Sequence, residues 1–422
     1  MMSKVYHLSL IAAGLLVGLL SSEVALRVAG VSYPIFFQVD GEVGAALRPE
    51  AEGWWTREGE QYVRINAVGF RDREHSIGRP DHVFRVAVLG DSFAEALQVS
   101  MKETFWAVME REMKGCPALA GQEPEVINFG VSGYGTAQEL IMLRRRVWAY
   151  APDVVLLAVT PTNDIRNNSR ALENDERRPY FVHQNGQLVE DLSFRDRTGF
   201  RLRHSSLGRL MARIRDSSRT FQLLNEALRR ARQPKRPGMS SDHRADRADG
   251  EGEPTWIRGE VGLDMAVYAE PTDHAWQEAW AVTEDLIRQM HKEVEARNKL
   301  FMVVTVSSGP QVGPDPAARR ALERRLGVPD LFYAEKRIQA VGRNLFPVVA
   351  LAPLFQAYAE ERGVFLHGFP NSGLGHGHWN AAGHRLAGEV IARHLCQTLL
   401  RAPMHDAAGQ GSRAVATYRT PF

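Results

Sequence analysis

Residues 83–93 read VFRVAVLGDSF, an apolar run that ends in Gly-Asp-Ser-Phe. An apolar run of this length, rich in valine and closed by glycine, predicts a strand that is buried on both faces. Similar runs occur four more times along the chain, at 125–129, 153–160, 300–306 and 346–351. The sequence therefore predicts five buried strands.

Helical patterns separate these strands. They cover 104–113, 136–150, 276–296 and 381–399, and Asn380 is in place to cap the last of them. Strands that alternate with helices predict an α/β fold with a five-stranded, mainly parallel sheet covered on both faces. The chain has 422 residues, of which 44% are hydrophobic and 24% charged. This composition provides for a large core and excludes a disordered or collagen-like chain.

The N-terminus carries a membrane signal. Lys4 precedes an apolar run at 8–20, and no charge follows until Glu23 and Arg27. A bilayer-spanning helix needs about 20 residues, so the run alone fits a cleaved secretion signal. A helix that continues to residue 30 would instead be a retained signal anchor, and a buried soluble helix is the third alternative. We expect the transmembrane anchor, 1–30, with the rest of the chain on the periplasmic side of the membrane.

The alternating pattern covers only part of the chain. We expect the α/β domain at 81–165 and 276–402, joined by a long helical insertion at 166–275. Ahead of it, 31–80 forms an extension with a β-hairpin, because residues 61–66 alternate between polar and apolar. The polar stretch 240–254 predicts a mobile loop, and the tail 403–422 predicts disorder.

Within the insertion, residues 201–237 hold eleven Arg or Lys against only Asp216 and Glu226. Apolar residues recur there at helical spacing: Leu207, Leu210, Met211, Ile214, Phe221, Leu224 and Leu228. One interpretation is a solvated arginine face on an ordinary amphipathic helix, and the other is contact with anionic headgroups beside the anchor. A net charge of +2 gives no drive toward nucleic acid, so we expect no nucleic-acid partner.

Four residues that can perform acyl transfer follow predicted strands. In an open parallel sheet, loops at the carboxyl ends of the strands gather on one edge. Ser92 can act as a nucleophile once His378 removes its proton. The amides of Ser92 and Gly133 and the side chain of Asn163 can stabilise an oxyanion. Ser132 lies in a partial Gly-x-Ser motif, but Tyr134 replaces its closing glycine, so we expect a turn residue there.

These residues stand in four blocks that resemble the SGNH, or GDSL, hydrolase family. The blocks are Gly-Asp-Ser-Phe at 90–93, Asn-Phe-Gly-Val-Ser-Gly at 128–133, Thr-Asn-Asp at 162–164 and His-Trp-Asn-Ala-Ala-Gly-His at 378–384. The resemblance covers roughly 61–165 and 276–400. It implies a flavodoxin-like three-layer α/β/α sandwich that needs no cofactor. Ser92 matches the nucleophile, His378 the base, and Gly133 and Asn163 the oxyanion donors.

The resemblance implies an exported serine esterase that hydrolyses small acyl esters. O-acetyl groups on envelope carbohydrate are the favoured substrate by analogy with the family. Two alternatives remain. Transfer of the acyl group to a sugar hydroxyl would make the protein an O-acyltransferase of envelope polysaccharide, and loss of catalysis would leave a polymer-binding envelope component.

The chain departs from the family pattern in two places. Pro161 begins the third block, where the family usually has glycine. The family also places an aspartate two or three residues before the catalytic histidine, but this chain has Gly375 and His376 there. His378 could then be oriented by a backbone carbonyl, by His376 or by a carboxylate from elsewhere. The fourth alternative is a dyad of serine and histidine, with weak activity or none.

Several further residues carry secondary expectations. His367, His376, His378 and His384 resemble a metal cluster, but no carboxylate accompanies them, so we expect no metal. Asp91 and Asp164 are expected to shape loops. The segment 66–72 resembles one found ahead of the serine block in membrane-anchored family members, and it either packs or lines the cleft. Cys116 and Cys396 are expected as buried thiols, with a disulfide as the alternative.

Overall fold

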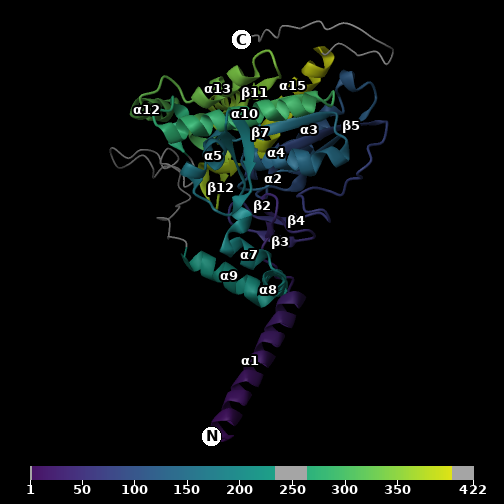
Figure 1. Ribbon diagram of the computed structural model, residues 1–422, viewed down its shortest axis with the longest axis vertical. Coiled ribbons are helices and arrows are strands. Elements are labelled where there is room, and N and C mark those ends of the chain that lie inside the picture. The colour runs from purple at the N-terminus through teal and green to yellow at the C-terminus, as the bar shows by residue number, and fades with distance from the viewer. Residues whose placement is uncertain (1, 233–263, 402–422) are drawn as a thin grey trace.

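The computed structural model describes residues 2–232 and 264–401 (Figure 1). The loop expected at 240–254 and the tail expected at 403–422 lie outside the described residues. Within the described part, a five-stranded sheet forms the centre of the molecule, and its strands run in the order β11-β10-β7-β5-β6. These strands are β5 (Val83–Gly90), β6 (Glu123–Asn128), β7 (Val154–Val159), β10 (Leu300–Thr305) and β11 (Val348–Ala350). Every neighbouring pair is parallel, which confirms the five predicted strands and their parallel arrangement.

Side chains of the sheet alternate between two apolar layers, as strand geometry requires. Val86 and Val88 of β5 pack in the layer of α3 (Phe105–Met113), α14 (Leu351–Arg362) and α15 (Ala381–Arg401). Ala87 and Leu89 face the opposite layer. That layer includes α4 (Thr136–Arg145), α10 (His274–Glu295), α12 (Pro316–Leu326) and α13 (Tyr333–Gly342). The predicted three-layer α/β/α sandwich is therefore confirmed.

The N-terminal extension adds two hairpins to this core. They are formed by β1 (Phe37–Asp40) with β2 (Gly44–Leu47), and by β3 (Glu52–Trp55) with β4 (Gln61–Arg64). The strand predicted at 61–66 is β4. Short elements that lie around the site are α2 (Ser92–Glu95), α5 (Pro161–Asn167), α6 (Arg170–Glu173), α11 (Gly309–Val312), β12 (His367–Phe369) and β13 (Gly373–Trp379). Single 3-10 turns occur at Met101–Glu103, Pro117–Leu119, Val147–Tyr150, Ser193–Asp196 and Met265–Tyr268.

The insertion contains the predicted helices and, in addition, a hairpin. The helices are α7 (Thr198–His204), α8 (Ser206–Ser217) and α9 (Arg219–Arg232). The hairpin pairs β8 (Tyr180–Gln184) with β9 (Gln187–Asp191). Asn185 and Gly186 form its two-residue turn with positive φ angles of 52° and 76°. Asn-Gly is a strong sequence signal for such a turn, so the purely helical prediction overlooked a local motif.

The N-terminal apolar run belongs to one continuous helix, α1 (Met2–Val28). Its segment Ser9–Val28 has 20 residues, a mean hydropathy of 1.9 and no buried residue. Figure 1 shows α1 projecting away from the α/β domain. By length and composition this helix can cross a bilayer, as a retained signal anchor requires, and a secretion signal meets the same criterion.

The two cysteines form a disulfide, so the expectation of two buried thiols is wrong. Cys116 and Cys396 are bonded, with their Cα atoms 5.7 Å apart. The bond joins the segment after α3 to α15. Helices α3 and α15 can approach closely because α15 has Gly388 where they touch. A Cβ at that position would lie 2.5 Å from the carbonyl oxygen of Phe105 in α3.

Loss of this disulfide is expected to lower the free energy of unfolding by about 2–5 kcal/mol, because the bond closes a long loop in the unfolded chain. The variants Cys116→Ser and Cys396→Ser, compared with the oxidised wild type in urea, test this. Both variants should unfold at lower urea concentration. Equal midpoints in variants and wild type would show that the bond contributes nothing.

Candidate active site

Ser92 lies at the carboxyl end of strand β5, which lies between β7 and β6 in the sheet. The strand order reverses around β5, and such a switch point is where open α/β sheets place their ligands. Asp91 caps the short helix α2, and its Oδ1 accepts the Phe93 amide at 3.0 Å. Ser92 is the first residue of that helix and is 9% exposed. Its side chain is therefore held at the edge of the sheet by a fixed turn.

His378 of β13 contacts Ser92. The Ser92 hydroxyl lies 2.7 Å from His378 Nε2, within hydrogen-bond distance. The imidazole also packs against the ring of Phe93, with ring centroids 4.9 Å apart. Two residues separated by most of the chain are thus brought together, in the arrangement of a nucleophile and its base.

A carboxylate completes the arrangement, and it comes from the N-terminal extension. His378 Nδ1 donates to Glu58 Oε2 at 2.5 Å, and the backbone amide of His378 donates to Glu58 Oε1 at 2.8 Å. Of the four alternatives left open by the sequence, the structure therefore has the carboxylate from elsewhere. Glu58 lies in the turn between β3 and β4, just outside the stretch that resembles the SGNH family.

The turn that carries Glu58 is fixed from several sides. Trp55 Nε1 donates to the Glu58 carbonyl at 3.0 Å. Asn371, in the loop between β12 and β13, exchanges two hydrogen bonds with the backbone of Gly59, each 2.9 Å long. Gly377 is also required, since it has a φ of +70° and a Cβ there would lie 2.0 Å from Glu58 Oε1. These contacts hold the turn between β3 and β4 against the β12–β13 hairpin, which carries His378.

The charge of Glu58 is stabilised despite its burial. Burial raises the pKa of the carboxyl group, but hydrogen bonds and charge interactions with His378 outweigh this and hold the pKa below its ordinary value. Glu58 is therefore ionised at neutral pH. An ionised acceptor at Nδ1 favours the tautomer with a proton on Nδ1, so the lone pair of Nε2 faces the Ser92 hydroxyl.

Asn163 approaches the serine turn from α5. Its side-chain amide donates to Asp91 Oδ2 at 3.0 Å, which fixes the amide beside the turn that holds Ser92. Burial raises the pKa of Asp91, although the hydrogen bonds from Asn163 and Phe93 oppose the shift. Asp164 accepts the Thr160 amide at 2.9 Å. Both aspartates therefore shape loops, as predicted.

Pro161 occupies the first turn of α5. Proline is favoured there because that position needs no intrahelical amide donor. The departure from the family's usual glycine is therefore compatible with the helix that presents Asn163.

Gly133 is exposed and lies in a turn after β6, with a φ of +79° that favours glycine. Its neighbour Ser132 donates its hydroxyl to the carboxylate of Glu95, which places this turn beside α2. Ser132 is thus a turn residue, as expected. Burial raises the pKa of Glu95 to about 7. Within residues 2–232 and 264–401, the backbone amides of Ser92 and Gly133 donate no hydrogen bond.

The segment 66–72 packs beneath the site. Arg71 is buried, and its guanidinium donates to the carbonyl oxygens of Glu95 at 3.3 Å and Val99 at 2.6 Å. Asp72 accepts the amide of Asn128, at the end of β6, at 2.8 Å. Of the two roles considered for this segment, its contacts support packing.

The other buried histidines have structural contacts. His367 donates from Nδ1 to the Gly377 carbonyl at 2.7 Å, and its Nε2 lies 3.1 Å from Ser307 Oγ. Burial lowers the pKa of His367 to about 4. His384 Nδ1 accepts the Phe105 amide at 3.2 Å, and burial holds its pKa well below the ordinary value. In the described part of the chain, no group of three or more His, Cys, Asp or Glu side chains could hold a metal ion.

Comparison with known proteins gives only distant likenesses. No family model and no curated protein matches the chain. Similar solved structures include a putative lipolytic protein of the G-D-S-L family from Desulfitobacterium hafniense DCB-2, at 11% identity and a TM-score of 0.33, covering 73% of this chain and 98% of that chain. The acetyl xylan esterase AlAXEase has 12% identity and a TM-score of 0.33, covering 75% and 99%. A variant of Axe2, an acetyl-xylooligosaccharide esterase from Geobacillus, has 10% identity and a TM-score of 0.36, covering 75% and 94%. Because these values are low, the function proposed below rests on the sequence blocks and the geometry of the site.

Proposed function

We propose that the protein is a membrane-anchored serine esterase of the SGNH type. The observation that carries this proposal is the hydrogen-bonded chain of Glu58, His378 and Ser92 at the carboxyl end of β5. An ionised carboxylate, an imidazole and a hydroxyl in this order are the parts of an activated nucleophile.

The first half of the reaction forms an acyl-enzyme. Ser92 Oγ attacks the ester carbonyl carbon while His378 Nε2 takes the hydroxyl proton, and Glu58 stabilises the imidazolium that results. The oxyanion accepts hydrogen bonds from the amides of Ser92 and Gly133 and from the second N–H of the Asn163 side chain. The intermediate then collapses, the alcohol leaves with the proton from His378, and the acyl group remains on Ser92.

The second half repeats these steps with water. His378 takes a proton from water as the oxygen attacks the acyl-serine, and the same donors hold the second oxyanion. Cleavage of the bond to Ser92 returns the proton to its hydroxyl and releases a carboxylic acid. No cofactor enters the proposed reaction.

We further propose that the substrates are small acyl esters, with O-acetyl carbohydrate of the cell envelope as the favoured class. The four sequence blocks support this by their resemblance to the family. Two features support a site outside the cytoplasm. The helix α1 can anchor the chain, and the disulfide between Cys116 and Cys396 is the kind of bond that persists in oxidising compartments.

Covalent labelling tests the proposal directly. A fluorophosphonate probe should react with the folded wild type, and peptide mapping should place the modification on Ser92, because only an activated serine attacks such a probe. The control Ser132→Ala should still be labelled at Ser92, whereas Ser92→Ala should not be labelled. Failure of the folded wild type to react would favour the polymer-binding alternative.

A further inference from the structure

Helices α8 and α9 expose an apolar stripe. On α8, Leu207, Leu210, Met211 and Ile214 are 53–65% exposed and recur at i, i+3, i+4 and i+7, which places them on one helical face. On α9, Leu224 is 55% and Leu228 46% exposed. An ordinary amphipathic helix of a soluble domain buries its leucines on the core, but these side chains face outward.

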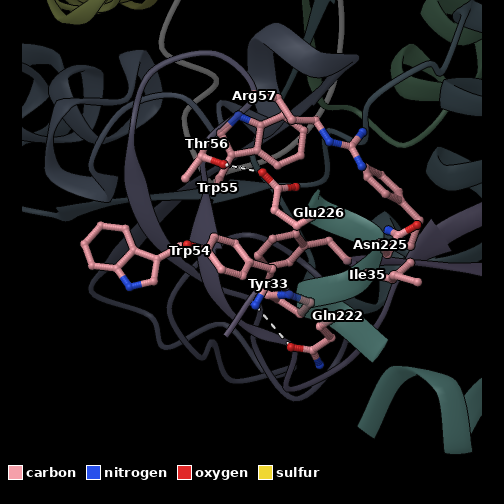
Figure 2. Close-up of a pocket in the computed structure, with 12 residues that line it drawn as sticks. Tyr33, Ile35, Trp54, Trp55, Thr56, Arg57, Gln222, Asn225 and Glu226 are labelled. Atoms are coloured by element: carbon pink, nitrogen blue, oxygen red, sulfur yellow. Dashed lines mark hydrogen bonds between the residues drawn. The ribbon is translucent and has the colours of Figure 1, made fainter. Parts of the chain in front are cut away.

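The opposite face of α9 is bound to the N-terminal extension. Gln222 accepts the Tyr33 amide at 3.1 Å, and Glu226 accepts the Thr56 hydroxyl at 3.2 Å, as Figure 2 shows. Gln222 also donates to the Asp216 carbonyl at 2.7 Å, which joins α9 to the end of α8. Because these polar residues hold α9 from one side, its leucines are directed away from the domain.

The helix pair is also fixed to the end of α1. Glu23 of α1 accepts the backbone amides of Arg219 at 2.9 Å and Thr220 at 3.0 Å, so it caps the N-terminus of α9. Arg27 donates to the Ser217 carbonyl at 2.7 Å. Figure 1 shows α8 and α9 beside the end of α1 that meets the domain. These contacts join the apolar stripe to the membrane span Ser9–Val28.

Exposed arginines lie beside the apolar stripe. Arg209 and Arg213 are exposed on α8 next to the stripe, and Arg201 and Arg203 are exposed on α7. The acid of α8, Asp216, is buried and contacts Arg48 and Arg215 rather than these side chains. Exposed arginines beside exposed leucines are the composition of a helix that lies at a membrane surface, where arginines meet phosphate groups and leucines enter the acyl region.

We infer that α7, α8 and α9 form a second membrane contact that lies in the headgroup region of an anionic bilayer. The inference rests on the proposed anchoring by α1. Phospholipid is the partner of this surface, because the apolar stripe is joined to α1 and is flanked by exposed arginines. Of the two interpretations of this segment, the solvated arginine face does not account for the exposed leucines.

The position of single labels relative to the membrane tests this inference in the full chain. We would attach an environment-sensitive fluorophore at Leu210→Cys, and as a matched control at Leu345→Cys, which is 50% exposed between α13 and β11. Each protein is reconstituted into vesicles of phosphatidylcholine with phosphatidylglycerol that carry nitroxides near the headgroups. Emission at position 210 should fall about twofold or more, and emission at position 345 should not change.

A charge variant tests the choice of lipid. Arg209→Glu with Arg213→Glu should weaken quenching at position 210, and so should vesicles of phosphatidylcholine alone. Quenching that is equal at positions 210 and 345 would overturn the inference, even if the protein floats with the vesicles. A protein that does not float with vesicles would contradict the proposed anchor instead. The readout needs no esterase activity, so failure of the proposed reaction is detected separately by the labelling of Ser92.

Discussion

The variant Glu58→Gln is expected to lower kcat for hydrolysis of p-nitrophenyl acetate by about four orders of magnitude. The reason is the way that Glu58 binds His378. The backbone amide of His378 donates to Oε1, so in the variant this position must hold the amide oxygen of glutamine. The NH2 group then faces Nδ1, which must become an acceptor. The proton moves to Nε2, and His378 cannot take a proton from Ser92.

The chain offers a matched control in the same turn. Glu60 is exposed, lies two residues away and makes no hydrogen bond with any described residue, so Glu60→Gln makes the same change of charge without touching the site. This control should keep wild-type kcat, and both variants should keep the thermal midpoint within a few degrees. A Glu58→Gln enzyme with nearly full kcat would show that the site operates as a dyad of Ser92 and His378.

Much of the fold was predictable because its signals are local. A buried parallel strand such as β5 is a mostly apolar run, and the loops after β5, β6 and β7 each contain a short motif. Ser92, Gly133 and Asn163 follow three adjacent strands, so knowledge of parallel sheets suffices to place them on one edge. His378 was found in the same way, from its own block of sequence.

Glu58 could not be found in this way. It lies 320 residues from His378, in a turn with no motif, and its position depends on contacts such as that of Gly59 with Asn371. The disulfide depends likewise on the close approach of α3 and α15 at Gly388. Both features are consequences of tertiary packing, which local patterns do not determine.

The origin of the carboxylate changes the role of the N-terminal extension. In the family pattern, the acid and the base stand in one loop, a few residues apart. In this chain the acid stands on the β3–β4 turn, and α9 contacts the same turn through Glu226 and Thr56. In the proposed reaction the extension therefore supplies the acid that positions His378. The same turn of the extension also contacts α9, which lies beside α1.

The variant His378→Ala is expected to lose more activity than Glu58→Gln, by about 10⁵-fold to 10⁶-fold in kcat, because no base remains for the Ser92 hydroxyl. Residual hydrolysis would come from the oxyanion donors and substrate binding. The neighbouring variant His376→Ala is the control, since Glu58 and not His376 is the partner of Nδ1. It should change kcat by less than about tenfold. Similar losses at both histidines would contradict the assignment of His378 as the base.

The losses of kcat caused by His378→Ala and by Glu58→Gln should not be additive. Glu58 acts only through the imidazole, so in the His378→Ala background the further change Glu58→Gln should leave the remaining kcat unchanged. In the wild-type background the same change is expected to lower kcat by about four orders of magnitude. Kinetics of the two single variants and the double variant on one ester substrate measure this difference. A further large loss in the double variant would mean that Glu58 acts on substrate directly or maintains the fold, because an acid whose only effect is to position His378 has nothing left to position.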